Sequence, residues 1–221
     1  MAEKLLMMFD LDGTLVNTVD AIISCANKVR ILAGFPKRDP SEIYSKIGLP
    51  PTEFFSDLDL DSNEIDGLIS DFRNTLNQVS FNSSSLYPGT HEVLEMFRDM
   101  RIPLAVATNK PTSNAELLLE KTSIREYFVK VQGSDGLNPK PHPDILLRLA
   151  KQVGVTKAIM VGDRSEDILA AKAAGFQSIG LAQTFHSEFD LKNSGAILVF
   201  TGMQEFANTF DETYIRDIIR S

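Results

Sequence analysis

The strongest constraint on the fold is a regular alternation of short apolar runs with amphipathic stretches over the second half of the chain. Each amphipathic stretch repeats its apolar residues at helical spacing. Strands that alternate with helices predict a parallel sheet with helices on both faces. Expected strands cover residues 102–108, 128–132, 157–162, 176–181 and 196–200, and expected helices cover 113–121, 143–153 and 166–174.

A long helical stretch separates these elements from a further apolar strand at residues 4–9. That strand can be buried only inside the later sheet. We therefore predict an α/β protein with a Rossmann-like parallel-sheet core, residues 1–16 and 86–221, and an all-helical cap inserted at 17–85. The first cap helix is expected to bury a stripe formed by Ala21, Ile22, Cys25, Ala26, Val29 and Leu32.

Capping residues mark the ends of the predicted cap helices. Asn17 is the expected N-cap of the first helix, and Gly34 is its expected stop. Asp61 with Glu64 three residues later predicts a capping box for the last one. Shorter helical pieces are expected at 41–47 and 51–57.

Polar residues follow four of the predicted strands. In an open parallel sheet, chemistry gathers at the carboxyl ends of the strands, so these residues are expected at one edge. The clusters are Asp10 with Asp12, Thr108 with Asn109 and Lys110, Lys140 in the loop after strand 128–132, and Asp163 with Asp167.

This set of side chains suits a phosphate group held between a metal ion and a lysine. Several carboxylates need a cation nearby, and oxygen ligands without a histidine or cysteine cluster favour Mg²⁺. Lys140 supplies a positive charge and Thr108 a hydroxyl donor. One carboxylate would attack phosphorus and form an aspartyl-phosphate, and a second would transfer protons to the leaving group and from water.

The motifs "DLDGT", the Thr108 strand end, "KPHP" and "GDRSED" are similar, in this order, to the four motifs of the haloacid dehalogenase-like hydrolases. The insertion after "DLDGT" resembles that family's small helical cap. The resemblance implies Asp10 as nucleophile and Asp12 as general acid and base. It implies phosphate binding by Thr108, Asn109 and Lys140, and Mg²⁺ binding by Asp10, the Asp12 backbone carbonyl and Asp163, with Asp167 as a ligand or supporting partner.

Within the family, "GLP", "YPG" and "TNKP" resemble phosphoglycolate phosphatases, which implies 2-phosphoglycolate as substrate. Asp12 argues against a dehalogenase. In the stretch Ile47–Phe55, Pro51 stands near the place where mutases of the β-phosphoglucomutase type carry an arginine. That mutase, a pyrophosphatase and a 5'-nucleotidase stay open as alternatives. A phospho-aspartate switch or a binding protein is the alternative outside enzymes.

The composition of the chain limits the classes of partner that it can bind. The formal net charge of −8 disfavours nucleic acid and anionic lipid, so the expected partner is a small phosphate ester. The single cysteine, Cys25, excludes an internal disulfide and fits the cytoplasm, and we expect no signal peptide or membrane span. A monomer or small homo-oligomer is expected.

The acidic run 57–66 does not match the calcium-binding loop of an EF-hand, and we expect it to be a solvated surface of the cap.

Overall fold

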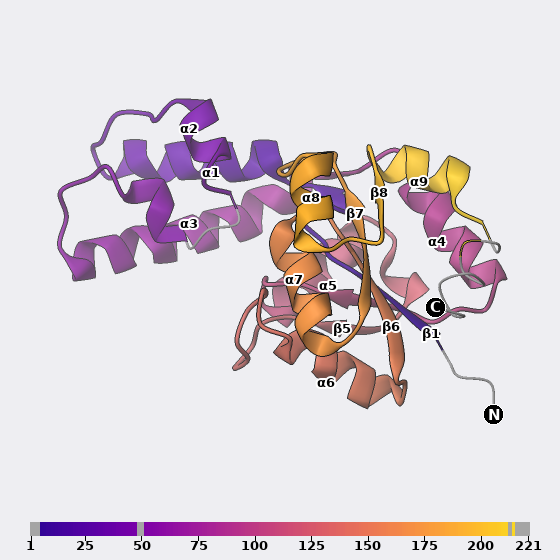
Figure 1. The fold of residues 1–221 in the computed structure, drawn as a ribbon. Coiled ribbons are helices and arrows are strands. Elements are labelled where there is room, and N and C mark those ends of the chain that lie inside the picture. The colour runs from indigo at the N-terminus through magenta and orange to yellow at the C-terminus, as the bar shows by residue number, and fades with distance from the viewer. Residues whose placement is uncertain (1–4, 48–50, 212–213, 215–221) are drawn as a thin grey trace. The chain divides into compact units, whose positions relative to one another are not determined.

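The computed structural model describes residues 5–47, 51–211 and 214, and the chain divides into two compact units (Figure 1). The α/β unit consists of Met1–Val16 and Leu86–Ser221, and the helical unit consists of Asn17–Ser85. The two points at which the chain passes between them are short strands, β2 (Val16–Asn17) and β3 (Ser85–Leu86), which pair with each other.

The α/β unit contains a parallel sheet in the order β5-β4-β1-β6-β7-β8. The strand β1 (Leu5–Phe9) lies inside the sheet between β4 and β6, as its apolar sequence predicts, with Met8 opposite Ala105 on one side and Met160 on the other. The other strands are β4 (Leu104–Ala107), β5 (Phe128–Gln132), β6 (Lys157–Gly162), β7 (Gln177–Leu181) and β8 (Leu198–Phe200). The predicted Rossmann-like parallel sheet is confirmed.

Helices cover both faces of the sheet. Leu6 and Met8 point to the face covered by α6 (Asp144–Val153) and α7 (Ser165–Ala174), where they share an apolar core. Phe9, the next residue, points the other way and meets Phe97 of α4 (Thr90–Asp99), with ring centroids 6.1 Å apart. On that side α4 lies beside α9 (Met203–Thr209), as Figure 1 shows.

The remaining helices of this unit are α5 (Thr112–Lys121), the 3₁₀ turn η2 (Arg125–Tyr127) and α8 (Glu188–Ser194). Neither α8 nor α9 is among the predicted helices. Both are short, so they offer little periodicity. The start of α8 nevertheless carries a local signal, because Ser187 and Asp190 form a capping box.

The helical unit contains α1 (Val19–Leu32), α2 (Pro40–Tyr44), the 3₁₀ turn η1 (Pro51–Phe55) and α3 (Ser62–Ser83). The rings of Phe54 and Phe55 in η1 pack against Phe72 of α3. The predicted buried stripe on α1 is wrong at one residue, Leu32. Its side chain is 75% exposed, because Leu32 lies in the final turn of the helix. Cys25 is buried, as predicted.

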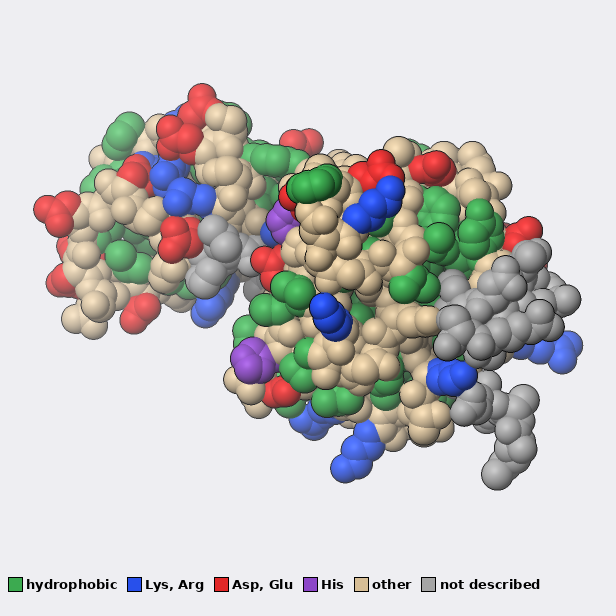
Figure 2. All heavy atoms as spheres, viewed as in Figure 1, with side chains coloured by type: hydrophobic (Ala, Val, Ile, Leu, Met, Phe, Trp, Pro, Cys, Tyr) green, Lys and Arg blue, Asp and Glu red, His purple; other side chains and the backbone are tan. Residues whose placement is uncertain are grey.

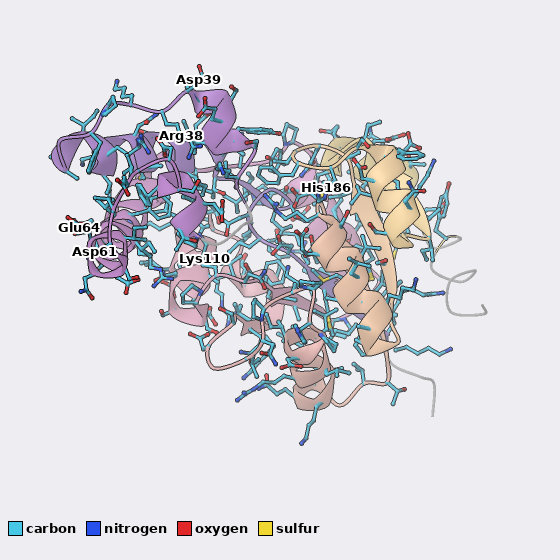
Figure 3. All side chains as sticks on the ribbon, turned by 60° about the vertical axis from the view of Figure 1, so that its left-hand side comes forward. Arg38, Asp39, Asp61, Glu64, Lys110 and His186 are labelled. Atoms are coloured by element: carbon cyan, nitrogen blue, oxygen red, sulfur yellow. The ribbon has the colours of Figure 1, made fainter. Side chains whose placement is uncertain are left out.

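The capping predictions are confirmed for α3 and corrected for α1. Asp61 Oδ1 accepts from the Glu64 backbone N–H, and Glu64 Oε2 accepts from that of Asp61, which completes the box at the labelled pair in Figure 3. The N-cap of α1 is Thr18, and Asn17 stands one residue earlier, where its Oδ1 accepts from the Val19 N–H at 3.3 Å. Gly34 follows the helix with a φ of +85°.

The acidic surface of the helical unit is solvated. Residues 61–64 are exposed, and Figure 2 shows Asp and Glu side chains scattered over the visible face of this unit. The segment Ile47–Phe55 contains Pro51, near the place of the arginine in mutases of the β-phosphoglucomutase type. Residues 48–50 of this segment lie outside the described residues. Every helix in the part of the chain that the structure describes is too short or too polar to cross a membrane.

Candidate active site

The site begins with a tight turn at the end of β1. Asp10 continues the sheet by donating its backbone N–H to the Val161 carbonyl at 2.9 Å. The chain then reverses, and the N–H of Gly13 donates to the Val16 carbonyl at 2.9 Å. Gly13 has a φ of +90°, and a Cβ atom there would lie 2.5 Å from Asp163 Oδ2. Glycine is therefore required both by the backbone conformation and by the close approach of Asp163.

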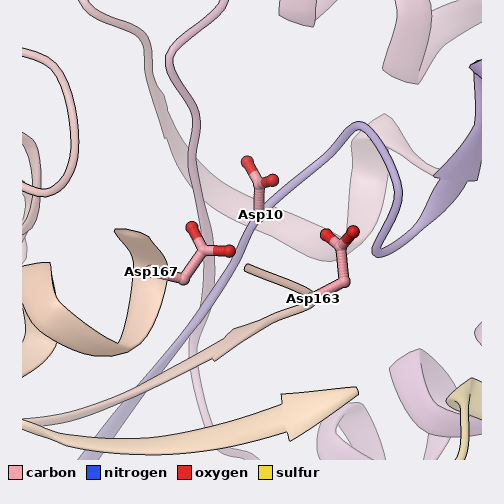
Figure 4. A group of neighbouring side chains, drawn as sticks. All are labelled: Asp10, Asp163 and Asp167. Atoms are coloured by element: carbon pink, nitrogen blue, oxygen red, sulfur yellow. The ribbon is translucent and has the colours of Figure 1, made fainter. Parts of the chain in front are cut away.

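Three aspartate side chains converge at this edge of the sheet (Figure 4). Asp10 follows β1, Asp163 follows the neighbouring strand β6, and Asp167 lies in the first turn of α7. All three are buried, and each offers a carboxylate oxygen within 4.8 Å of the others. The backbone N–H of Arg164 donates to Asp167 Oδ2 at 3.1 Å and holds that side chain against the strand end.

Lys140 reaches the same cluster from the loop between β5 and α6. Its Nζ lies 2.9 Å from Asp10 Oδ1 and 2.5 Å from Asp167 Oδ1, and it donates to the Ala107 carbonyl at 2.8 Å. Burial alone would lower the pKa of Lys140, but Asp10 and Asp167 outweigh it and raise that pKa. The lysine is therefore held as a buried cation between two carboxylates.

The cluster contains more negative than positive charge. Burial raises the pKa of Asp10 to about 6 against the opposing effect of Lys140, and burial raises the pKa of Asp163 well above its usual value. Asp163 Oδ1 accepts from the Thr14 hydroxyl at 2.8 Å, whereas Asp163 Oδ2 is buried without a hydrogen-bond partner among the described residues. An unpartnered buried oxygen in an oxygen-only cluster fits a divalent metal ion, which would supply the missing charge.

The carboxylate of Asp12 lies apart from this group. It is 23% exposed, and its Oδ1 is 3.1 Å from Lys110 Nζ. Among the His, Cys, Asp and Glu side chains that the structure describes, those close enough to share one metal ion are Asp10, Asp163 and Asp167. Lys110, which follows Thr108 and Asn109, thus pairs with the second aspartate of the "DLDGT" motif.

Thr108 and Asn109 stand at the end of β4. Thr108 is buried, and its Oγ1 accepts from the Lys110 N–H at 3.2 Å. The Asn109 side-chain amide brackets the Lys140 backbone: its Oδ1 accepts from the Lys140 N–H at 2.7 Å, and its Nδ2 donates to the Lys140 carbonyl at 3.1 Å. Asn109 therefore fixes the backbone from which the Lys140 side chain extends.

Two residues at this site were not predicted from the sequence. Thr14 orients Asp163, and Gln183, in the loop after β7, contacts the turn that carries Asp12. Thr14 belongs to the "DLDGT" motif and could have been found there, whereas a lone glutamine after a strand carries no local signal.

Two histidines lie near the site in sequence. His142 is exposed, and Nδ1 of His186 accepts the Ser165 N–H at 2.8 Å (His186 is labelled in Figure 3).

Known proteins are similar to this chain in sequence and in fold. A family model described as haloacid dehalogenase-like hydrolase matches residues 7–181. A probable phosphatase of Dickeya dadantii is 32% identical over 197 residues, covering 86% of each chain. A phosphoglycolate phosphatase of Vibrio vulnificus is 32% identical over 196 residues, covering 83% of this chain and 86% of the relative.

The solved structures that are similar in fold include members of the same family as the relatives found by sequence. A haloacid dehalogenase-like hydrolase from Streptococcus pneumoniae superposes with a TM-score of 0.83 at 25% identity, covering 96% of this chain and 100% of the other. A predicted phosphoglycolate phosphatase from Haemophilus somnus gives a TM-score of 0.84 at 26% identity, covering 94% and 98%. The chain therefore belongs to the haloacid dehalogenase-like hydrolase family.

Proposed function

We propose that this chain is a Mg²⁺-dependent phosphatase that hydrolyses small phosphate monoesters, with 2-phosphoglycolate as the preferred substrate. The family match and the phosphatases among its relatives support a hydrolase acting on phosphate esters. The observation that carries the proposal is the buried cluster in which Lys140 bridges Asp10 and Asp167, while Asp163 Oδ2 finds no hydrogen-bond partner in the part of the chain that the structure describes. The choice of ester rests on relatives such as the phosphoglycolate phosphatase of Vibrio vulnificus.

In the proposed reaction, an Asp10 oxygen attacks the phosphorus of the ester. A bond forms between that oxygen and phosphorus, and the bond from phosphorus to the ester oxygen breaks. Asp12 gives its proton to the departing oxygen and then removes a proton from the water that cleaves the aspartyl-phosphate. Asp12 suits this role because its carboxylate is partly exposed and is not one of the three clustered acids.

The metal would be held by Asp10, Asp163 and the backbone carbonyl of Asp12, with Asp167 as a further ligand or a supporting partner. When bound, Mg²⁺ would shield the charge of Asp10 from the phosphate anion that it attacks. Lys140 and Thr108 would hold the phosphate oxygens. Asn109 would serve the phosphate site by fixing the Lys140 backbone.

The helical unit is proposed to act as a cap that excludes water during attack on phosphorus and selects the leaving group. It is inserted between Val16 and Leu86, directly after the turn that carries Asp12. The cytoplasm is the proposed location, because the single cysteine of the chain, Cys25, is a buried free thiol, which fits a reducing compartment. A monomer or small homo-oligomer is the proposed state.

The decisive experiment is phosphate release from a panel of small monoesters, including 2-phosphoglycolate, with Mg²⁺ and with a chelator. One dominant, metal-dependent substrate supports both the chemistry and the ester. Low activity spread over many esters supports the chemistry and rejects 2-phosphoglycolate. A variant with Asp10→Asn, purified in parallel, controls for contaminating phosphatases.

Two other results would contradict the proposal. If sugar phosphates were isomerised rather than hydrolysed, the chain would be a mutase of the β-phosphoglucomutase type. If no ester turned over while Asp10 stayed phosphorylated, the chain would be a phospho-aspartate switch. Inorganic pyrophosphate and nucleoside monophosphates belong in the panel, because a pyrophosphatase or 5'-nucleotidase would use the same site.

A further inference from the structure

The loop after β7 contacts the turn between β1 and β2 through side chains that bind its backbone. Gln183 Nε2 donates to the carbonyl oxygens of both Gly13 and Thr14, at 2.8 and 2.9 Å. The Thr184 hydroxyl donates to the Gly13 carbonyl at 2.9 Å. Gln183 and Thr184 are about 170 positions away from this turn in the chain, and they bind the two backbone carbonyls that follow Asp12.

Gln183 is itself held from the other side. Its Oε1 accepts the backbone N–H of Met203, the first residue of α9, at 2.8 Å. A side-chain amide has two N–H donors and one carbonyl acceptor, and all of these functions are used here. The amide cannot rotate by 180° without placing its oxygen against two carbonyls, so its orientation is determined at both ends.

These contacts determine the orientation of Thr14. The Gly13 carbonyl belongs to the peptide plane before Thr14, and the Thr14 carbonyl belongs to the plane after it. Because Gln183 binds both, it fixes the two planes that flank Thr14 and therefore the direction of its Cα–Cβ bond. The Thr14 hydroxyl in turn donates to Asp163 Oδ1 at 2.8 Å. Gly13 has no side chain with which to stabilise the turn from within.

We propose that Gln183 is a positioning residue of the active site: it locks the turn from Asp12 to Thr14, so that Asp12 faces the leaving group and Thr14 holds Asp163. This inference rests on the proposed function for its catalytic consequence, but the lock itself is a property of the backbone. The alternative is that Gln183 only ties α9 to the sheet and contributes to stability alone.

The lock is tested by amide hydrogen exchange, which needs no activity. Gln183→Met keeps the length of the side chain but removes its hydrogen bonds. We expect exchange of the Gly13, Leu15 and Val16 amides, which are hydrogen-bonded within the turn, to accelerate about tenfold, the factor for losing about 1.4 kcal/mol of hydrogen bonding. Amides of β6 should keep their rates. Unchanged exchange in the turn, or equal acceleration throughout the α/β unit, would overturn the proposal.

The matched control is Gln204→Met, at an exposed position on α9 whose side chain contacts Asn208 of the same helix. It removes the same chemical group from the helix that Gln183 touches. We expect wild-type exchange in the turn for this variant. Acceleration there comparable to that of Gln183→Met would show that α9 stability, and not the Gln183 contacts, governs the turn, and the proposal would fall.

The catalytic consequence is tested by comparing esters with good and poor leaving groups. Since a displaced Asp12 protonates a departing oxygen less well, Gln183→Met should lower kcat about 10- to 100-fold for an alkyl phosphate and clearly less for p-nitrophenyl phosphate. Equal losses for both esters would indicate a merely structural role and overturn the proposal. If the wild type hydrolysed no ester, the proposed function would fail, and the exchange experiment would still decide whether Gln183 locks the turn.

Discussion

The two units of this protein each contain a cluster of charged side chains around a buried cation, and the two clusters differ in whether their charges are balanced. In the α/β unit, three clustered aspartates face one lysine, and Asp163 Oδ2 has no hydrogen-bond partner among the described residues. In the helical unit, the buried Arg30 guanidinium pairs in bidentate fashion with Asp57, at 2.7 and 2.8 Å. Arg38 lies 3.1 Å from Asp57 and pairs with Glu42 at 2.8 Å, so two arginines face two carboxylates. Arg30 also donates to the carbonyls of Pro36 and Phe54, at 3.0 and 3.2 Å.

The two clusters differ in how the protein environment shifts the pKa values of their carboxylates. Hydrogen bonds from Arg30 lower the pKa of Asp57, so that pair is most stable when both groups are ionised. In the α/β unit, burial raises the pKa values of Asp10 and Asp163, so burial disfavours the ionised form of both carboxylates. We therefore expect the balanced cluster to stabilise the fold, and the unbalanced cluster to lower the stability of the fold without a metal.

The largest expected effect comes from Asp10→Asn, which should lower phosphatase activity by at least about 10³-fold because it removes the proposed nucleophile. The metal-free variant should be at least as stable as the wild type, since the substitution removes a buried charge from an unbalanced cluster. Phosphate release and chemical denaturation in a chelator measure the two effects. A variant that kept full activity would contradict the mechanism.

The matched control is Asp57→Asn, the same chemical change in the balanced cluster. It should lower the free energy of unfolding by about 1–2 kcal/mol, a discounted value because Asp57 is 38% exposed. Its activity per folded molecule should stay at the wild-type level. If both variants lost stability to the same extent, the distinction between the two clusters would be wrong.

A smaller effect on rate is expected for Asp12→Ala, because Asp12 lies outside the clustered acids. The rate of the first step should fall about 10²-fold for an alkyl phosphate, which needs its departing oxygen protonated, and much less for p-nitrophenyl phosphate. Pre-steady-state phosphorylation of Asp10 measures this step directly. Equal losses for the two esters would count against Asp12 as the proton donor.

Arg30→Met tests the balanced cluster from its buried side. Arg30 is 2% exposed, and its removal takes one donor from the Pro36 and Phe54 carbonyls and two from Asp57. Arg38 still lies 3.1 Å from Asp57, so we expect a loss of about 2 kcal/mol in the free energy of unfolding. The midpoint of urea denaturation measures it. Lys28→Met, at an exposed position of the same helix, is the control and should change stability little. A mild effect of Arg30→Met would mean that the ion pair is dispensable.

The smallest expected effect is a pH dependence of the metal-free protein. The pKa of Asp10 is about 6 in the folded chain and 3.8 as its ordinary value, and the pKa of Asp163 is raised in the same direction. Between these values the folded state binds more protons than the unfolded state, so stability falls as pH rises from about 4 to 6. We expect Tm in a chelator to drop by roughly 5 °C across this range.

Mg²⁺ provides the control for the pH experiment. A metal bound to ionised carboxylates lowers their pKa values, so saturating Mg²⁺ should flatten the decline and raise Tm most at pH 7. The dependence should also weaken in the Asp10→Asn variant. A Tm that rises with pH in the chelator would refute the view that these carboxylates are unfavourable anions in the metal-free fold.

Much of the fold was predictable because it is written in local patterns. The apolar runs identified each strand of the sheet to within two residues at either end, and the Asp61 and Glu64 pair identified the start of α3. The polar residues at the strand ends indicated which side chains would meet: Asp10, Asp163, Asp167 and Lys140 are in fact neighbours. Short helices such as α8 and α9 escaped because a helix of two turns shows little periodicity.

Other features depend on contacts between residues that are distant in sequence. Arg30 looks like an ordinary surface residue of an amphipathic helix until the chain places Asp57, Pro36 and Phe54 around it. Asn109 is predicted from the sequence to bind phosphate, and only the structure shows that its side-chain amide also holds the Lys140 backbone. Gln183 has no neighbour in the sequence that suggests a role, and its partners Gly13 and Met203 lie on different elements.

By itself, the sequence determined the parallel α/β architecture, the position of the helical insertion and the acids at the end of β1, because periodicity and strand-end chemistry act over a few residues. Only the tertiary structure decided which of these acids cluster, which oxygen lacks a partner and which side chains orient the turn. Such properties depend on burial and on distances across the sheet. They arise only when β1, β4 and β6 lie side by side and the loop after β7 reaches Gly13.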